Sequence, residues 1–266
     1  MISRLIAESR KIVFKFGSST LADGDAKINP LLLDEYAEQI ADLIKAGKQI
    51  VIVSSGAQAA GLSTMHQWAR KKDINYRQAL CAVGQVELMT TWSRAFEKFH
   101  LHIGQILLTR ADFGDPIRTL NMRNTLFTLV DEGIIPIINE NDTISVDEIK
   151  IGDNDTLAAQ SAILWSADLL VLFSDIDGLF TKNPKEFSDA ELLEVVDDIE
   201  AIRDRVTIGS TNLLGTGGIA TKISAAEKAV PYGISIIIAN GSRERAIEAL
   251  VAGRQHGTAF LVKGEK

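Results

Sequence analysis

The feature that most constrains the fold is an alternation of short apolar runs with stretches of helical periodicity along the whole chain. Most of the runs are continuously apolar, as in strands that are buried on both faces of a parallel sheet. The strands predicted in this way are residues 11–16, 49–54, 102–108, 134–138, 169–173, 234–239 and 258–262. Helices are predicted over residues 76–99, 119–132, 155–166, 220–232 and 243–252, and over a first segment that Asn29 and Pro30 open and Gly47 closes.

A chain that alternates strands and helices forms right-handed βαβ crossovers. We therefore expect an α/β fold, a three-layer α/β/α sandwich around a central, mostly parallel sheet. The 266 residues contain no linker, low-complexity tract or repeat, which predicts a single domain over residues 1–266. Alternating apolar residues at 145–151 are typical of a small hairpin that projects from the sheet.

Composition and charge narrow the possible partners. Hydrophobic residues make up 46% of the chain and charged residues 24%, as in ordinary globular proteins. The net charge of −7 argues against a nucleic-acid partner. No apolar run approaches the ~18 residues of a membrane span, and the N-terminus lacks a signal-peptide core, so we expect no membrane and a cytoplasmic location. The single cysteine, Cys81, excludes an internal disulfide and is predicted to be a buried structural thiol.

Residues 215–222 place a glycine-rich turn before a predicted helix and put Lys222 one turn into it. Glycines let backbone N–H groups approach an anion, and a helix N-terminus carries partial positive charge. The lysine adds a full charge, which suits a phosphoryl group, although the segment alone could be only a tight turn. A second lysine and glycine turn, at Lys15 and Gly17, follows the first predicted strand. An acidic protein must bind anions with such local devices, so the two lysines indicate a phosphate site.

Small and polar residues follow several of the predicted strands or open a helix. They occupy residues 54–61, 139–142, 152–155 and 174–178. Each segment alone is typical of a turn or a helix cap. Because ligands of parallel α/β sheets collect at the carboxyl ends of the strands, the four together predict a polar binding site at one rim of the sheet.

Several other chemistries lack their sequence signals. No P-loop is present, which argues against a Walker-type NTPase. Residues 215–220 match the form of a dinucleotide fingerprint, but only residues 206–208 could supply the preceding strand. The strand that follows ends without an acidic residue to bind a ribose. His100 and His102 have no third metal ligand near them in the sequence.

The lack of a well-placed histidine itself favours one class of kinase. Kinases that phosphorylate an alcohol use a carboxylate base, whereas a carboxylate acceptor is already ionised at neutral pH. An enzyme of the second kind needs positioning and charge neutralisation by lysines, amide groups, glycine turns and Mg²⁺.

With these motifs in place, the chain resembles the amino acid kinase family, and within it the glutamate 5-kinases. The resemblance runs from about residue 11 to about residue 260. The segments that carry it are residues 13–18, 51–57, 82–85, 107–112, 121–125, 135–142, 150–155, 177–181 and 215–222. The Asn-Glu-Asn-Asp, Gly-Asp-Asn-Asp and Gly-Thr-Gly-Gly motifs are the more specific to the glutamate enzymes.

The resemblance implies a role for each matching residue. Lys15 and Lys222 would contact the ATP phosphates and stabilise the transferring phosphoryl group, and Asp155 would hold both lysines. Glutamate would be bound by Ser55, Asp142 and Asn154, with Asn139 nearby, and Gly56 would let a backbone amide approach it as Gly17 would at the phosphates. The remaining implied contacts to ATP are Ser174, Asp175, Thr216, Gly217, Gly218, Ile219, Ala220 and Thr221.

The resemblance also implies cofactors, partners and a reaction. The implied cofactors are ATP and Mg²⁺, and the implied acceptor is L-glutamate, in the first step of proline biosynthesis. A γ-glutamyl phosphate reductase would take the product, and the enzyme would be a homo-oligomer. No metal ligand from the protein is expected. Family members commonly carry a C-terminal PUA domain, and we expect this chain to be a form that lacks it. Kinases of aspartate, acetylglutamate, carbamate or UMP, and a non-catalytic nucleotide or amino-acid sensor, remain the alternatives.

Overall fold

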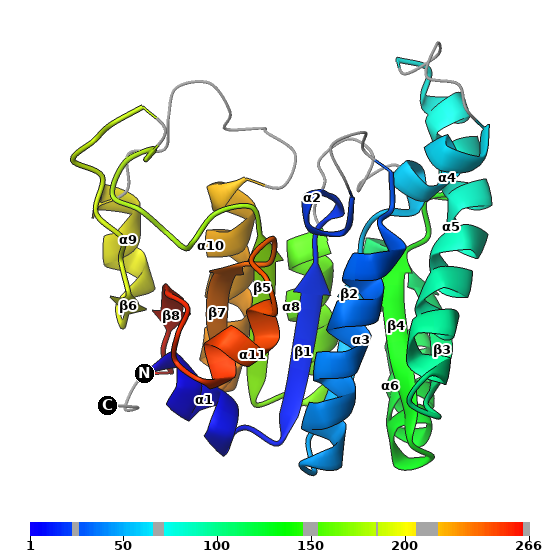
Figure 1. Ribbon diagram of the computed structural model, residues 1–266, viewed down its shortest axis with the longest axis horizontal. Coiled ribbons are helices and arrows are strands. Elements are labelled where there is room, and N and C mark those ends of the chain that lie inside the picture. The colour runs from blue at the N-terminus through cyan, green and yellow to red at the C-terminus, as the bar shows by residue number, and fades with distance from the viewer. Residues whose placement is uncertain (23–26, 66–71, 146–153, 185, 206–217, 263–266) are drawn as a thin grey trace.

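A computed structural model describes residues 1–22, 27–65, 72–145, 154–184, 186–205 and 218–262. Its centre is an eight-stranded sheet of order β3-β4-β2-β1-β5-β7-β8-β6 (Figure 1). The strands are β1 (Lys11–Phe16), β2 (Gln49–Ser54), β3 (His102–Leu108), β4 (Ile134–Glu140), β5 (Leu169–Ser174), β6 (Val195–Val196), β7 (Ser235–Asn240) and β8 (Gly257–Phe260). All pairings are parallel except that of β7 with β8.

Helices cover both faces of the sheet. One face carries α1 (Ile2–Glu8), α3 (Pro30–Lys45), α5 (Ile74–Glu97) and α11 (Ala246–Val251), of which α3 and α11 lie in front in Figure 1. The other face carries α6 (Pro116–Asp131), α8 (Asn154–Trp165), α9 (Ile199–Arg205) and α10 (Ile219–Ala229). The remaining helices are α2 (Ser18–Leu21), α4 (Ala57–Met65), η1 (Arg110–Gly114) and η2 (Val230–Tyr232).

The central strands are largely apolar because they supply side chains to two cores. In β1, Ile12, Phe14 and Phe16 pack against the α3, α5 and α11 face, whereas Val13 packs against the α8 and α10 face. Side chains alternate between the two faces of a strand. A strand that is covered on both faces therefore buries successive side chains, and most of them are apolar. The predicted three-layer sandwich is confirmed.

The predicted bounds of β1, β2 and β3 are confirmed, and β4 and β5 end slightly later than predicted. The helix predicted over residues 220–232 instead divides into α10 and η2, because Pro231 cannot donate the hydrogen bond that would continue α10. The helix predicted from residue 243 begins only at Ala246, after Arg245 in a left-handed conformation. The predicted hairpin at 145–151 and the candidate strand at 206–208 lie outside the described residues, apart from Ser145.

One segment predicted as a loop is largely helical. Residues 54–61, whose composition is typical of a turn or a helix cap, are helical from Ala57, where α4 begins. Its small residues serve close packing, since a Cβ on Gly61 would lie 2.0 Å from the Leu80 carbonyl oxygen of α5. Only Ser55 and Gly56 remain between β2 and the helix.

In the portion of the chain that the structure describes, no helix is both long enough and apolar enough to cross a membrane.

Candidate active site

The carboxyl ends of four neighbouring parallel strands bring the predicted site residues to one rim of the sheet, the upper rim in Figure 1. Lys15 lies near the end of β1, Asn139 near the end of β4, Ser174 ends β5, and Ser55 follows β2. The chain order places β2 on one side of β1 and β5 on the other. Where the connections leave a strand toward opposite sides of the sheet in this way, a crevice opens at the strand ends. Parallel α/β proteins bind their ligands in such crevices.

Three charged side chains meet in this crevice. Lys15 Nζ lies 2.7 Å from Asp155 Oδ1, and Lys222 Nζ lies 3.0 Å from Asp155 Oδ2. The Thr221 hydroxyl donates to the same Oδ2 over 2.7 Å. The side chains of Lys15 and Lys222 are only 5% and 3% exposed, and that of Asp155 is fully buried. We call these four residues the lysine–aspartate cluster.

The electrostatics of the cluster favour an incoming anion. Burial by itself would raise the pKa of Asp155, but the ammonium groups of Lys15 and Lys222 outweigh it and hold that pKa far below its usual range. The pKa of Lys222 is lowered, chiefly by burial and also by Lys15, against the opposing effect of Asp155. Two ammonium groups share one carboxylate, so the cluster carries an excess positive charge on buried side chains. A phosphate would supply the missing negative charge.

Lys222 reaches the cluster from the first turns of α10. Gly218 is the N-cap residue, and the Thr221 hydroxyl also donates to the Gly218 carbonyl oxygen. The helix start and the lysine predicted from the sequence are therefore present, with Gly218 as the last residue before the helix. Thr216 and Gly217 lie outside the described residues.

A row of side-chain hydrogen bonds runs beside the cluster and joins four elements. Asn154 Nδ2 donates to Ser55 Oγ over 2.7 Å and to Asn139 Oδ1 over 3.0 Å. Asn139 Nδ2 in turn donates to Gln85 Oε1 of α5 over 2.8 Å. We call Ser55, Asn154, Asn139 and Gln85 the amide series. Because Asn154 and Asp155 are consecutive residues of α8, the amide series and the lysine–aspartate cluster are held together at the start of one helix.

Asp142 follows the end of β4 and is joined to α5. Burial raises the pKa of its carboxyl group to about 7, and Glu140 adds to this effect, while a Cys81 hydrogen bond and Arg77 oppose it. Gln78 Nε2 donates to the Asp142 carbonyl oxygen over 2.9 Å. Asp142 Oδ1 and Asn154 Oδ1 are buried oxygens with no hydrogen-bond partner among the described residues, so both can accept from a ligand.

The remaining predicted residues lie around these two groups. Gly56 has a φ of +107°, which favours glycine, and Gly17 leaves space where a Cβ would lie 3.6 Å from Lys15 Nζ. Ser174 Oγ lies 3.3 Å from Asp175 Oδ1, and Asp175 is exposed. Its charge acts on Lys222 by raising the pKa of that amino group. Ile219 and Ala220 form the first turn of α10.

Three residues of α5 were not predicted as part of the site. Gln85 and Gln78 are glutamines on a helix, for which sequence spacing carries no functional signal. Cys81 is buried as predicted, but its thiol also bonds the carboxylate of Asp142. All three lie at intervals of three and four residues and therefore on one face of α5.

The described residues include no group of three or more side chains suited to a metal ion. The buried carboxylate nearest the lysines, Asp155, is already paired with two ammonium groups. These described residues do not fit a metal ion held by the protein itself.

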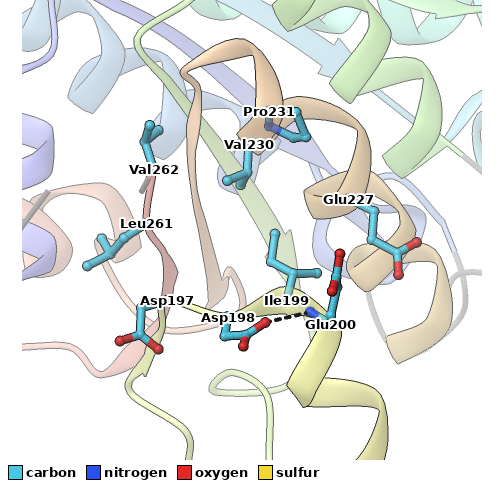
Figure 2. Close-up of a pocket in the computed structure, with 9 residues that line it drawn as sticks. All are labelled: Asp197, Asp198, Ile199, Glu200, Glu227, Val230, Pro231, Leu261 and Val262. Atoms are coloured by element: carbon cyan, nitrogen blue, oxygen red, sulfur yellow. Dashed lines mark hydrogen bonds between the residues drawn. The ribbon is translucent and has the colours of Figure 1, made fainter. Parts of the chain in front are cut away.

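A separate cavity of about 610 Å³ lies between α9, α10 and the end of β8 (Figure 2). Its lining contains none of the predicted site residues and has four carboxylates around an apolar floor. The lining residues are Asp197, Asp198, Ile199, Glu200, Glu227, Val230, Pro231, Leu261 and Val262. Asp198 also accepts the backbone N–H of Glu200 and so caps α9. This acidic rim would repel a nucleotide phosphate, and the cavity is not the phosphate site.

A family model and individual protein sequences both match this chain over most of its length. The model of the amino acid kinase family matches residues 10–240. The chain is 57% identical over 260 residues to a glutamate 5-kinase of Alkaliphilus metalliredigens (strain QYMF), with 98% of each chain covered. It is 46% identical over 257 residues to a glutamate 5-kinase of Pasteurella multocida (strain Pm70), covering 97% of this chain and 70% of that protein.

Solved structures share the fold. A UMP kinase from Ureaplasma parvum superposes with a TM-score of 0.64 at 14% identity, covering 96% of this chain and 99% of that one. An isopentenyl phosphate kinase gives a TM-score of 0.63 at 17% identity, covering 94% and 99%. At such low identity these likenesses establish the architecture and nothing about the substrate.

Proposed function

Since the chain belongs to the amino acid kinase family, we propose that it transfers the γ-phosphoryl group of ATP to the side-chain carboxylate of L-glutamate. The observation that carries this proposal is that Asn154 and Asp155 are consecutive residues of α8, so that the amide series adjoins the lysine–aspartate cluster. The high identity to glutamate 5-kinases over the whole chain supports glutamate as the acceptor.

In the proposed reaction, Lys15 and Lys222 neutralise charge on the transferring phosphoryl group. A carboxylate oxygen of glutamate attacks the γ-phosphorus, a P–O bond forms, and the bond to the oxygen of ADP breaks. The acceptor is ionised at neutral pH, so no general base is required. Catalysis then consists of positioning and electrostatic stabilisation, which the buried lysine–aspartate cluster suits.

Asp155 would act as the positioning residue for both lysines. Its two oxygens hold one ammonium group each, so the amino groups are fixed before the nucleotide arrives. A preorganised pair of charges stabilises a transition state better than charges that must reorient during the reaction.

Glutamate would lie against the amide series. Asp142 Oδ1 and Asn154 Oδ1 are buried acceptors that suit the substrate ammonium group, and Ser55 lies within the same series. Asn139 would support Asn154, and Gly56 would let its backbone approach the substrate. This arrangement would direct the side-chain carboxylate toward the lysines.

ATP would lie along the first turn of α10 and the end of β5. Its contacts would be Lys15, Gly17, Ser174, Asp175, Thr216, Gly217, Gly218, Ile219, Ala220, Thr221 and Lys222. Mg²⁺ would enter with the nucleotide phosphates, since the described residues hold no metal cluster of their own.

The product would be an acyl phosphate, which hydrolyses readily. The reaction would be the first step of proline biosynthesis, and a reductase that takes γ-glutamyl phosphate would consume the product. We propose further that the chain is a single kinase domain that works as a cytoplasmic homo-oligomer.

An acceptor panel tests the proposal. ADP release is measured with ATP and Mg²⁺ in the presence of L-glutamate, L-aspartate, acetylglutamate, carbamate or UMP. The proposal expects release that depends on glutamate. Release with another acceptor would retain the phosphoryl site but overturn the substrate, and ATP binding without turnover on any acceptor would favour a sensor.

A further inference from the structure

The amide series ends at Gln85, a residue that has no role in the proposed function. Gln85 lies on α5, whereas the proposed glutamate ligands come from the loops and helix at the strand ends. Its Oε1 accepts from Asn139 Nδ2 over 2.8 Å. We propose that Gln85 is a positioning residue that fixes the amide orientations of Asn139 and Asn154 and so sets the affinity for glutamate. This inference rests on the proposed function.

The amide of Asn139 is held at both ends, its oxygen by a backbone group and its nitrogen by Gln85. The backbone N–H of Glu140 donates to Asn139 Oδ1 over 2.9 Å, so this oxygen must face Glu140. Asn139 Nδ2 is then turned toward α5, where it needs an acceptor. Gln85 Oε1 is that acceptor.

The same constraint passes to the substrate side. With its oxygen toward Glu140, Asn139 also accepts from Asn154 Nδ2, which donates to Ser55 as well. Both donations turn Asn154 Oδ1 away from the series, and this buried oxygen has no partner among the residues that the structure describes. The orientation of a proposed ligand of the substrate ammonium group therefore depends on hydrogen bonds that end at Gln85.

The backbone of α5 is held where Gln85 can reach Asn139. The neighbouring residue is Gly84, and a Cβ there would lie 1.8 Å from the Ala57 carbonyl oxygen of α4. Gly61 of α4 packs equally closely against Leu80 of α5. Two glycines thus allow the helices to touch along their backbones, and this contact leaves α5 little freedom to shift.

The rest of the same face of α5 contacts the neighbouring Asp142. Gln78 donates to the Asp142 carbonyl oxygen, and the Cys81 thiol bonds its carboxylate. One face of a helix that holds none of the proposed ligands thus contacts two residues assigned to glutamate. Gln85 differs from Gln78 in acting on a side-chain amide instead of the backbone.

A double-mutant cycle tests the role of Gln85. Gln85→Met keeps a long, helix-favouring side chain but removes the acceptor, which leaves Asn139 Nδ2 unpaired. The expected result is an increase of about ten-fold in the KM for glutamate, with kcat and the KM for ATP changed by less than about two-fold. In an Asn139→Ala background, Gln85→Met should have no further effect, because the amide on which it acts is gone.

The control is Glu87→Met, at an exposed position two residues along the same helix. It should leave all three kinetic constants unchanged, and the melting temperatures of all variants are recorded to detect unfolding. Equal effects of Gln85→Met in the two backgrounds, or a fall in kcat without a change in the KM for glutamate, would overturn the positioning role. If the unaltered protein does not phosphorylate glutamate, both this inference and the proposed function fail, whereas a normal wild type with an inert Gln85→Met variant refutes the inference alone.

Discussion

Lys15 Nζ lies 2.7 Å from Asp155 Oδ1 in a pair that is almost completely shielded from water. Such a pair is costly to desolvate, and breaking it by removing one partner costs more than the pair contributes. Here the carboxylate serves a second lysine as well, so the buried charges do not cancel. An arrangement with uncompensated positive charge is suited to binding an anion.

The first prediction concerns the carboxylate of this pair. Asp155→Asn leaves two buried ammonium groups without their counter-charge, which should cost about 3–5 kcal/mol in the free energy of unfolding. At about 2–4 °C per kcal/mol, the melting temperature should fall by roughly 10 °C. Asp189→Asn, which breaks the surface pair with Lys182, should change it little. Similar melting temperatures for the two variants in a thermal unfolding experiment would contradict this account.

The second prediction separates the buried lysine of α10 from an exposed one. Lys222→Met should lower kcat by about 10²–10³-fold, because it removes a charge that acts on the transferring phosphoryl group. Lys228→Met changes a lysine of the same helix whose ammonium group contacts Thr156 and Ser224. Steady-state kinetics should show near-normal turnover for Lys228→Met. Equal turnover for the two variants would remove Lys222 from the mechanism.

The third prediction is a pH dependence of glutamate binding. Burial raises the pKa of Asp142 to about 7, so its carboxyl group becomes ionised, and able to bind an ammonium group, as the pH rises through 7. The KM for glutamate should therefore fall between about pH 6 and pH 8 and then level off. Asp142→Asn should raise the KM and flatten this profile, while the KM for ATP stays independent of pH over the same range.

The same pKa shift has an opposite consequence for stability without ligand. The pKa of Asp142 is higher in the folded state than the ordinary value of about 4, so the folded state binds more protons between pH 4 and 7. Asp142 thus destabilises the fold increasingly as the pH rises through this window, and the cost is full above about pH 7. Asp142→Asn should raise the melting temperature at pH 8 but leave it unchanged at pH 4; a decrease at pH 8 would contradict the shift.

The fourth prediction tests the close contact of α4 and α5. Gly84→Ala would place a Cβ 1.8 Å from the Ala57 carbonyl oxygen, so the helices must separate. Overpacking of this kind costs about 1–3 kcal/mol, or several degrees in melting temperature. Gly114→Ala is the matched control, since a Cβ there meets nothing within 4 Å. Gly84→Ala should also raise the KM for glutamate, because Gln85 moves with its helix.

Continuous apolar runs made most of the sheet predictable from the sequence. The bounds of β1 and β2 follow from burial on both faces, which leaves a clear signal in the residue types. The antiparallel pairing of β8 with β7 could not be predicted, because the direction of a strand depends on how its connection crosses the sheet, which the residue types of the strand do not encode. Helix α4 was not predicted because the small residues that allow its close contact with α5 are also typical of a loop.

The site was predictable where glycines and charged residues stand next to strand ends. The spacing of Lys15 and Lys222 from their glycine turns indicated an anion site, and the structure brings both to Asp155. Gln85 lies in a segment that carries the family resemblance, residues 82–85, but nothing in the sequence indicated a role for it. The role proposed for it depends on which face of α5 meets β4 and on the orientation of one amide.

The most direct test of the central claim is identification of the product. The protein is incubated with ATP, Mg²⁺ and L-glutamate in the presence of hydroxylamine, which captures an acyl phosphate as a hydroxamate, and the product is compared by mass spectrometry and chromatography with the two authentic glutamyl hydroxamates. The account predicts the γ-glutamyl hydroxamate, formed in proportion to ADP and lost in Lys222→Met. Formation of ADP without any hydroxamate, or of the α-isomer alone, would contradict phosphoryl transfer to the side-chain carboxylate.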